Sequence, residues 1–141
     1  MKTNLHLGFQ GNCDEAFSFY EHAFGAKRLM TMRYRDVPQQ TPASEEAGNL
    51  IAHTALPLGG ITLMGADAPP GKGSPMGGFQ IAIEDPDEAT VRRIFDALSE
   101  GGSVFMPPGK QFWSPLFGMC TDKFGVSWMV GMPAQQSQSQ S

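Results

Sequence analysis

The sequence predicts an α+β fold made of two consecutive βαβββ modules, over residues 3–66 and 77–132, whose sheets form half-open barrels. Two amphipathic helical segments carry this prediction, because each follows one short apolar strand and precedes three more. The expected caps of the two helices lie 73 residues apart, and the glycines that end them lie 76 residues apart. Because one helix covers only one face of a four-stranded sheet, the other face must curl around a partner or a ligand.

The first helix is expected directly after Asn12. This residue stands three positions before Glu15, which is the spacing of a capping box with Asn as a variant cap. Gly25 supplies the end of the helix. Between these signals lies an apolar stripe at helical spacing, made of Ala16, Phe17, Tyr20, Ala23 and Phe24.

The second helix repeats these signals. Asp85 is the expected cap, Pro86 occupies the first helical position, and Glu88 stands three residues after the cap. Gly101 and Gly102 end the helix. Its apolar stripe consists of Val91, Ile94, Phe95 and Leu98.

The strands are expected at 5–9, 27–35, 49–57 and 60–65 in the first module and at 79–84, 103–107, 115–121 and 126–131 in the second. Two segments fall outside this plan. Residues 36–48 are polar, contain proline and show no period, which predicts a long mobile loop. Residues 134–141 are of low complexity and are expected to form a disordered tail after a single domain over 1–133.

The composition narrows the classes of function. A chain of 141 residues with 40% hydrophobic and 17% charged residues is globular, and a net charge of −4 argues against nucleic acid as a partner. No apolar run reaches the ~20 residues that a membrane span needs, and no charged-then-apolar leader opens the chain. We therefore expect a soluble, cytoplasmic protein. The nine Met and ten Phe residues fit either a gap-filling core or an adaptable apolar cleft.

Three segments carry a family resemblance: residues 11–26 (GNCDEAFSFYEHAFGA), the stretch from His53 through Gly59 and Gly60 to Met64, and residues 101–130. Together they closely resemble the PhnB-like branch of the vicinal oxygen chelate superfamily, which includes glyoxalase I, extradiol dioxygenases and bleomycin-resistance proteins. The resemblance covers residues 3–132. It implies paired βαβββ modules, a homodimer, and sites where modules meet.

The resemblance also implies a divalent metal held by His and Glu at four cleft positions. In this chain these positions fall at Leu5, Gly78, His53 and Met129, with Phe79 or Gln80 replacing Gly78 if the register slips. His53 is the one competent ligand among the four, and metal catalysis needs about three protein ligands. His6 would reach the first position only by a one-residue slip that turns the strand inside out. We therefore expect no metal and no other cofactor.

His53 is the candidate catalytic residue, because an imidazole in an apolar strand can serve as an acid or a base near neutral pH. The alternative is a structural histidine hydrogen-bonded to a neighbouring strand. Strand alternation turns Gln80 toward the cleft. The residues expected to line the ligand-binding cleft are Leu5, Phe9, His53, Gln80, Phe112, Trp113 and Met129.

Several side chains leave alternatives open. Phe112 and Trp113 either stack on a flat ligand or close the dimer interface. Arg33 and Arg35 either form a charged outer face or bind an anion in the cleft, and the outer face is favoured. Trp128 is expected in the core. Cys13 stands at the start of the first expected helix, where the helix N-terminus can activate a thiol, but it is expected to be a packing residue.

The sequence thus favours a metal-free, homodimeric protein that binds a small aromatic or amphipathic molecule. The alternative is a lyase, isomerase or dioxygenase that uses His53 as an acid or base, or as part of an unconventional metal site. A third interpretation is an interaction module without a ligand. The identity of any substrate is not encoded in a recognisable motif.

Overall fold

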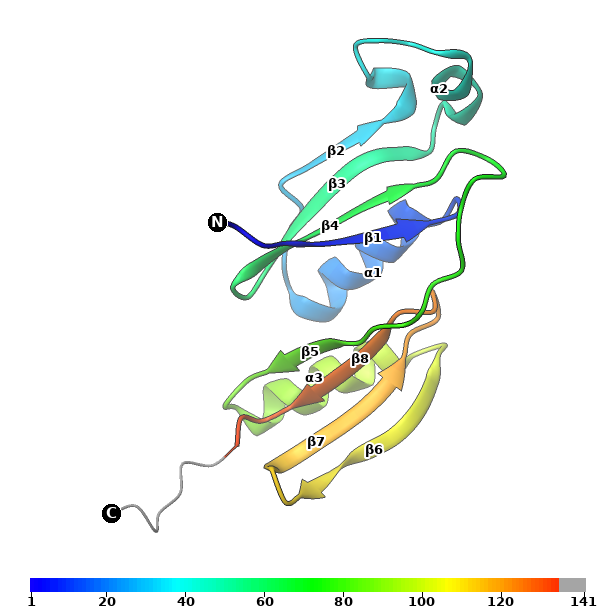
Figure 1. The fold of residues 1–141 in the computed structure, drawn as a ribbon. Coiled ribbons are helices and arrows are strands. Elements are labelled where there is room, and N and C mark those ends of the chain that lie inside the picture. Colours follow the sequence, from blue (N-terminus) through cyan, green and yellow to red (C-terminus); the bar gives the residue numbers. More distant parts are fainter. Residues whose placement is uncertain (135–141) are drawn as a thin grey trace. The chain divides into compact units, whose positions relative to one another are not determined.

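The computed structural model describes residues 1–134, and the chain divides after Met76 into two compact units (Figure 1). Each unit contains one four-stranded sheet and one long helix. The segment expected to form a disordered tail lies outside the described residues, apart from Ala134, which is exposed.

Unit 1 has a mixed sheet in the order β1-β4-β3-β2. The strands that come first and last in the sequence of this unit, β1 (Leu5–Phe9) and β4 (Ile61–Asp67), are neighbours and pair in parallel. The other neighbouring strands pair antiparallel. The helix α1 (Cys13–Phe24) connects β1 to β2 (Met30–Arg33), and β3 (Ile51–Leu58) follows an insertion.

Unit 2 repeats this topology in the order β5-β8-β7-β6. The strand β5 (Ile81–Glu84) pairs in parallel with β8 (Ser127–Gly131), and α3 (Glu88–Ser99) lies between β5 and β6 in the chain. The strands β6 (Ser103–Gln111) and β7 (Ser114–Thr121) complete an antiparallel set with β8. The prediction of two βαβββ modules is therefore confirmed.

The insertion between β2 and β3 differs from its prediction as a structureless loop. It contains a 3₁₀ turn, η1 (Tyr34–Asp36), and a short helix, α2 (Pro42–Ala47). Thr41 Oγ1 accepts a hydrogen bond from the Ser44 N–H at 3.1 Å, and Ser44 Oγ accepts one from the Thr41 N–H at 2.8 Å. This reciprocal capping box, with Pro42 in the first turn, forms a helix too short for an amphipathic period to reveal it.

The start of α1 also corrects the sequence prediction. Asn12 makes no side-chain capping bond. Instead, the carboxylate of Asp67, at the end of β4, accepts hydrogen bonds from the backbone N–H groups of Gly11 (2.9 Å) and Cys13 (3.0 Å). A residue more than fifty positions away thus satisfies the helix N-terminus, which sequence spacing does not reveal.

The start of α3 lies later than predicted. Asp87 is the cap, and its carboxylate accepts from the Thr90 N–H at 3.0 Å. Asp85 Oδ1 accepts from the Asp87 N–H at 2.8 Å, so Asp85 closes the preceding turn instead of capping the helix. The chain leaves α3 at Glu100, and Gly101 follows with a φ of +77°, so the end was predicted closely.

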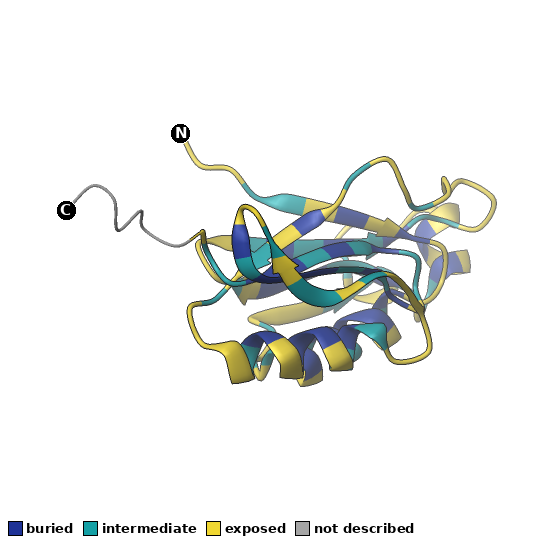
Figure 2. Cartoon of the chain, turned by 90° about the horizontal axis from the view of Figure 1, so that it is seen from below, coloured by how far each residue is buried: buried dark blue, intermediate teal, exposed yellow. Residues whose placement is uncertain are grey.

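Each helix buries its apolar stripe against one face of the sheet in its own unit, and its other side is exposed (Figure 2). Gly65 lies beneath the Phe17 ring and Gly118 beneath the Phe95 ring, so neither position has room for a Cβ. Trp128 is fully buried and donates its indole N–H to Asp122 at 2.9 Å, which confirms the prediction that it belongs to the core.

The methionines lie outside these two cores. The buried apolar residues of the described chain include Leu, Ile, Val, Phe, Ala, Cys, Tyr and Trp but no Met. The gap-filling explanation of the methionine content is therefore wrong for this fold.

The longest helices among residues 1–134 have 12 residues each and none is apolar enough to cross a membrane. At 1.5 Å per residue, such a helix extends over about 18 Å, short of the ~30 Å hydrocarbon layer.

Candidate functional site

The open face of each sheet, defined as the face opposite the helix of its own unit, carries the candidate functional residues. In unit 1, alternation sends Leu7, Gly65 and Leu63 toward α1, so their neighbours along the strands point the other way. The open face of unit 1 includes His6, Gly8, Met30, Met32, His53, Ala55, Met64 and Ala66, with Pro57 and Thr62 further along β3 and β4.

The strand register corrects two predicted cleft residues. Leu5 pairs with the fully buried Leu63, and Phe9 is buried with its ring edge-on to Phe17 of α1, at a centroid distance of 6.2 Å. Both therefore face the helix. His6 lies on the open face without any slip of the strand, because it pairs with Met64. The expectation that Leu5 faces the cleft and that His6 reaches it only by a slip of the strand is therefore wrong: Leu5 faces the helix and His6 faces away from it.

His53 lies half-buried on the same open face, beside Met32 of β2. Extending the β3–β4 ladder by one residue brings Ala66 beside it, and Gly8 is the next position across the sheet. These small residues leave space next to the imidazole. The ring makes no hydrogen bond to any residue within 1–134. The alternative that His53 is a structural histidine, hydrogen-bonded to a neighbouring strand, is therefore wrong.

The charge of His6 depends on its surroundings, which include His53. The pKa of His6 is lowered from its usual value, mainly because partial burial disfavours the charged ring and further because of the nearby His53. His6 is thus held toward its neutral form, in which one ring nitrogen accepts a hydrogen bond.

Unit 2 presents a different set on its open face. Leu116, Gly118 and Trp128 face α3, and the alternating partners face away from it. The open face of unit 2 includes Ala82, Glu84, Met106, Phe117, Met119, Met129 and Gly131, together with the hydrogen-bonded pair Thr121 and Ser127.

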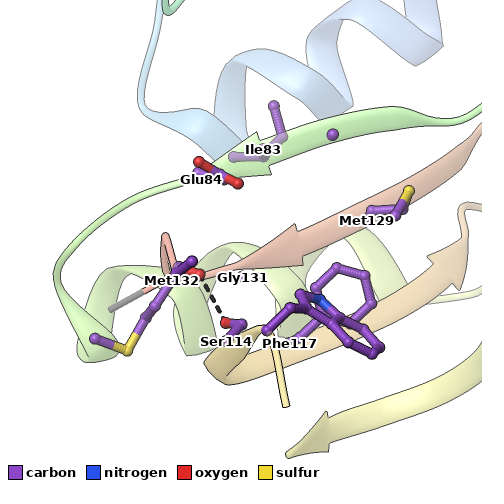
Figure 3. Close-up of a pocket in the computed structure, with 10 residues that line it drawn as sticks. Ile83, Glu84, Ser114, Phe117, Met129, Gly131 and Met132 are labelled. Atoms are coloured by element: carbon purple, nitrogen blue, oxygen red, sulfur yellow. Dashed lines mark hydrogen bonds between the residues drawn. The ribbon is translucent and has the colours of Figure 1, made fainter. Parts of the chain in front are cut away.

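A hollow of about 240 Å³ lies on this open face (Figure 3). Its lining consists of Ala82, Ile83, Glu84, Trp113, Ser114, Phe117, Met129, Gly131, Met132 and Ala134. Gly131 lines the hollow without adding a side chain to it. A Cβ there would approach the Leu116 carbonyl oxygen to 2.8 Å and the Phe117 ring to 3.0 Å, so the position has room only for glycine. Apart from Glu84 and Ser114 the lining is apolar, as in most small-molecule pockets.

An aromatic cluster borders the hollow. The Trp113 ring lies 5.2 Å from the Phe117 ring, edge-on, and 4.7 Å from the Phe112 ring, also edge-on. Trp113 contributes to the lining, whereas Phe112 is almost fully exposed. Within unit 2, the structure thus brings the predicted residues Trp113 and Met129 together at one hollow.

Ser114 contributes a hydroxyl group to the lining, and this group forms hydrogen bonds with the backbone. Its Oγ lies 2.7 Å from the Met132 carbonyl oxygen and 2.8 Å from that of Leu116, and it accepts from the Leu116 N–H at 3.2 Å. Because the Ser114 Oγ is already bonded to the backbone, it is not placed as an activated nucleophile.

The strand pairing also corrects the internal repeat. Met64 pairs with His6 and Ala55, whereas Met129 pairs with Ala82 and Met119, so Met129 corresponds to Met64. It does not correspond to His53, whose counterpart two residues before Met119 is Phe117. The offset of 76 residues between the glycines that end the two helices would equate His53 with Met129. This offset does not hold within the sheets, because η1 and α2 lengthen unit 1 between β2 and β3.

The donor set does not fit the divalent metal that the family resemblance implies. His6 and His53 are two imidazoles on one open face, while Ala82 occupies the matching position in unit 2 and Met129 offers only a thioether. Among the residues that the structure describes, no group of three or more His, Cys, Asp or Glu side chains is placed to hold a metal ion.

The remaining candidates do not line the hollow of unit 2. Arg33 donates to Asp14 on α1 at 3.1 Å, and Arg35 is exposed beside Asn49, so neither arginine faces the open face. Gln80 is exposed, one residue before β5. Cys13 is buried, and burial raises the pKa of its thiol, so it is a packing residue.

Sequence reasoning missed Glu84 and Phe117 as lining residues. Glu84 was recognisable in principle, because the alternation that places Ile81 and Ile83 beneath α3 turns Ala82 and Glu84 to the other face. Phe117 gave no such signal, since its strand is apolar on both faces.

Comparisons with known proteins agree with this architecture. The sequence profile of the Glyoxalase/Bleomycin resistance protein/Dioxygenase superfamily matches residues 6–130. The chain is 31% identical to protein YjdN of Escherichia coli K12, over 96% of this chain and 98% of that protein. Protein PA1353 of Pseudomonas aeruginosa is 36% identical over 96% of this chain and 99% of its own, with a TM-score of 0.85.

A PhnB protein from Bacillus cereus shares the fold, with a TM-score of 0.77 and 24% identity over 94% of this chain and 99% of its own. The repeated βαβββ topology, the profile match over most of the chain and these relatives lead to one conclusion. The chain belongs to the Glyoxalase/Bleomycin resistance protein/Dioxygenase superfamily, and its structural neighbours include PhnB-like proteins.

Proposed function

We propose that this protein binds a small, largely apolar molecule on its open faces, without a metal. The observation that carries the proposal is the distribution of methionine. Six of the nine Met residues lie on the open faces, at Met30, Met32, Met64, Met106, Met119 and Met129. Methionine is flexible and polarisable, so a surface rich in it adapts to the shape of an apolar ligand.

The aromatic cluster and the hollow support the same function. Trp113 and Phe117 offer ring surfaces beside a concave apolar lining, which is the usual composition of a small-molecule site.

The proposal includes a homodimer. The half-buried methionines together with Val104, Phe105 and Phe112 leave much apolar side-chain surface accessible. Contiguous patches of this kind usually mark association, and a stable two-fold interface buries more than about 1,200 Å² in total. Light scattering at micromolar concentration is expected to give twice the monomer mass of 15.2 kDa. A monomer would contradict this part.

An enzymatic function is the second candidate, favoured by the pair His6 and His53. Two imidazoles on one face, one of them held toward its neutral form, can act as base and hydrogen-bond donor. Turnover of a substrate that His53→Ala abolishes while binding persists would establish this alternative.

Titration with the neutral fluorophore Nile red tests the binding function. We expect a saturable rise in fluorescence, and Trp113→Ala should weaken binding by ~1–1.5 kcal/mol through lost ring contact. Phe105→Ala is the control, because it removes an exposed aromatic ring that does not line the hollow. Absence of saturable binding, or equal effects of the two variants, would contradict the proposal.

A further inference from the structure

The hollow of unit 2 carries a charge that its apolar lining does not require. Among the described residues that line it, Glu84 alone has an ionisable side chain. Glu84 forms no ion pair with any residue in 1–134, so its carboxylate is not neutralised by the fold. A ligand in this hollow therefore meets one negative charge and no positive one.

The strand pairing fixes where this carboxylate lies. Glu84 pairs with Gly131, which in turn pairs with Phe117, so the three occupy one row across the open face. Gly131, which lies between them in the row, adds no side chain of its own, and the Phe117 ring stands against the place where its Cβ would be. Figure 3 shows Glu84 at the β5 edge and Phe117 on the other side of β8.

The aromatic side of the row suits the same kind of ligand. Trp113 stands 5.2 Å from Phe117, and aromatic faces attract both flat apolar rings and cations. An anionic ligand is not attracted by the faces of these aromatic rings, and the carboxylate of Glu84 repels it. The net charge of −4 adds to this repulsion.

We propose that the hollow of unit 2 selects flat or elongated apolar molecules that carry one positive charge, with Glu84 as the counter-ion and Trp113 and Phe117 as the stacking surface. This ligand class rests on the proposed binding function and makes it more specific. Glu84 sets the preference by charge, and the apolar lining supplies the binding of the uncharged part.

Three quinoline probes of similar size test this charge preference: the cation N-methylquinolinium, the neutral quinaldine at mildly alkaline pH, and the anion quinaldate. The Trp113 indole N–H signal in NMR titrations reports occupancy of the hollow, since this ring lines it. We expect the cation to bind roughly three- to ten-fold more tightly than quinaldine, and the anion more weakly than both. Added salt should weaken binding of the cation and leave quinaldine unaffected.

The variant Glu84→Gln keeps the shape of the side chain and removes its charge. We expect it to abolish the preference for N-methylquinolinium while quinaldine binds as before. Glu100→Gln is the matched control, because it removes the same charge at an exposed position after α3 that does not line the hollow.

The outcomes separate this inference from the binding function. If Nile red binds but the cation and quinaldine bind equally, or if Glu100→Gln acts like Glu84→Gln, the charge selectivity is wrong and the binding function stands. If neither Nile red nor any quinoline binds saturably, both are wrong.

Discussion

The two units share a strand topology, yet matching positions on their open faces carry different chemistry. Where unit 1 has His6 on its leading strand, unit 2 has Ala82, and where unit 1 has His53, unit 2 has Phe117. In the same row, Gly8 of unit 1 corresponds to Glu84. One open face thus offers imidazoles, and the other offers a carboxylate and aromatic rings.

This difference shows that the fold conserves the layout and not the side chains between its two copies. The helix-covered faces need apolar residues in both units, because each must exclude water beneath its helix. The open faces have no such requirement, so each position there is free to serve a ligand.

The two helix starts differ in a parallel way. The N-terminus of α1 is held by Asp67 from another strand, whereas α3 is capped by Asp87 from its own turn. Asp67 also accepts a hydrogen bond from the Ile51 N–H at 2.9 Å, so one buried carboxylate joins β4, α1 and β3. Unit 1 depends on a tertiary contact where unit 2 uses a local one.

The largest expected effect concerns this contact. Asp67→Ala leaves three backbone N–H groups without their acceptor, and we expect it to lower the free energy of unfolding by about 3–5 kcal/mol. Asp87→Ala should cost clearly less, because its helix start is exposed to water. Urea denaturation measures both, and equal losses would break the comparison.

The next effect concerns the ligand on the open face of unit 1. His53→Ala should weaken Nile red binding by ~1–3 kcal/mol if the imidazole donates to or accepts from the ligand in the site. His22→Ala is the control, because His22 is exposed on α1. Unchanged binding in His53→Ala would confine the ligand to the hollow of unit 2.

A smaller effect is expected in the titration of His6. Since His53 contributes to the lowered pKa of His6, His53→Gln should raise that pKa toward its usual value. The rise should be incomplete, because burial is the larger cause. NMR titration of the ring protons measures it, with His22→Gln as the comparison variant. A His6 pKa that stays the same in His53→Gln would show that the two rings do not interact.

The smallest effect is acid sensitivity at the outer side of α1. The hydrogen bond from Arg28 is the main cause that lowers the pKa of Asp14, with Arg33 also contributing. A lowered folded-state pKa stabilises the fold above the unfolded value near ~3.9 and loses this stabilisation as the pH falls through the folded value. Asp14→Asn should therefore lower stability at neutral pH, by less than about 1 kcal/mol because the pair is partly exposed, and not at strongly acidic pH.

Unit 2 provides the control for this last measurement. Asp96→Asn removes an exposed carboxylate from α3. We expect its stability difference from the wild type to show no comparable dependence on pH. A pH profile of Asp14→Asn parallel to that of the wild type would contradict the assigned ion pairs.

The sequence by itself determined the repeated βαβββ order, the two apolar helix stripes, and the burial of Trp128, because these follow from local periodicity. The family resemblance led to Met129 as a cleft residue, and the turn framed by Pro and Gly led to Trp113, for which a dimer interface was the alternative; both line the hollow of unit 2. The short helix α2 escaped prediction because a single capping box carries no period.

Only the tertiary structure decided which residue of each neighbouring pair faces the helix. His6 and not Leu5 lies on the open face, because the pairing of β1 with β4 sets the register and a shift of one residue reverses the whole strand. The role of Asp67 and the correspondence of His53 with Phe117 likewise depend on contacts between strands distant in sequence. Local propensity cannot specify such pairings, because their stabilisation arises only when the sheet is assembled.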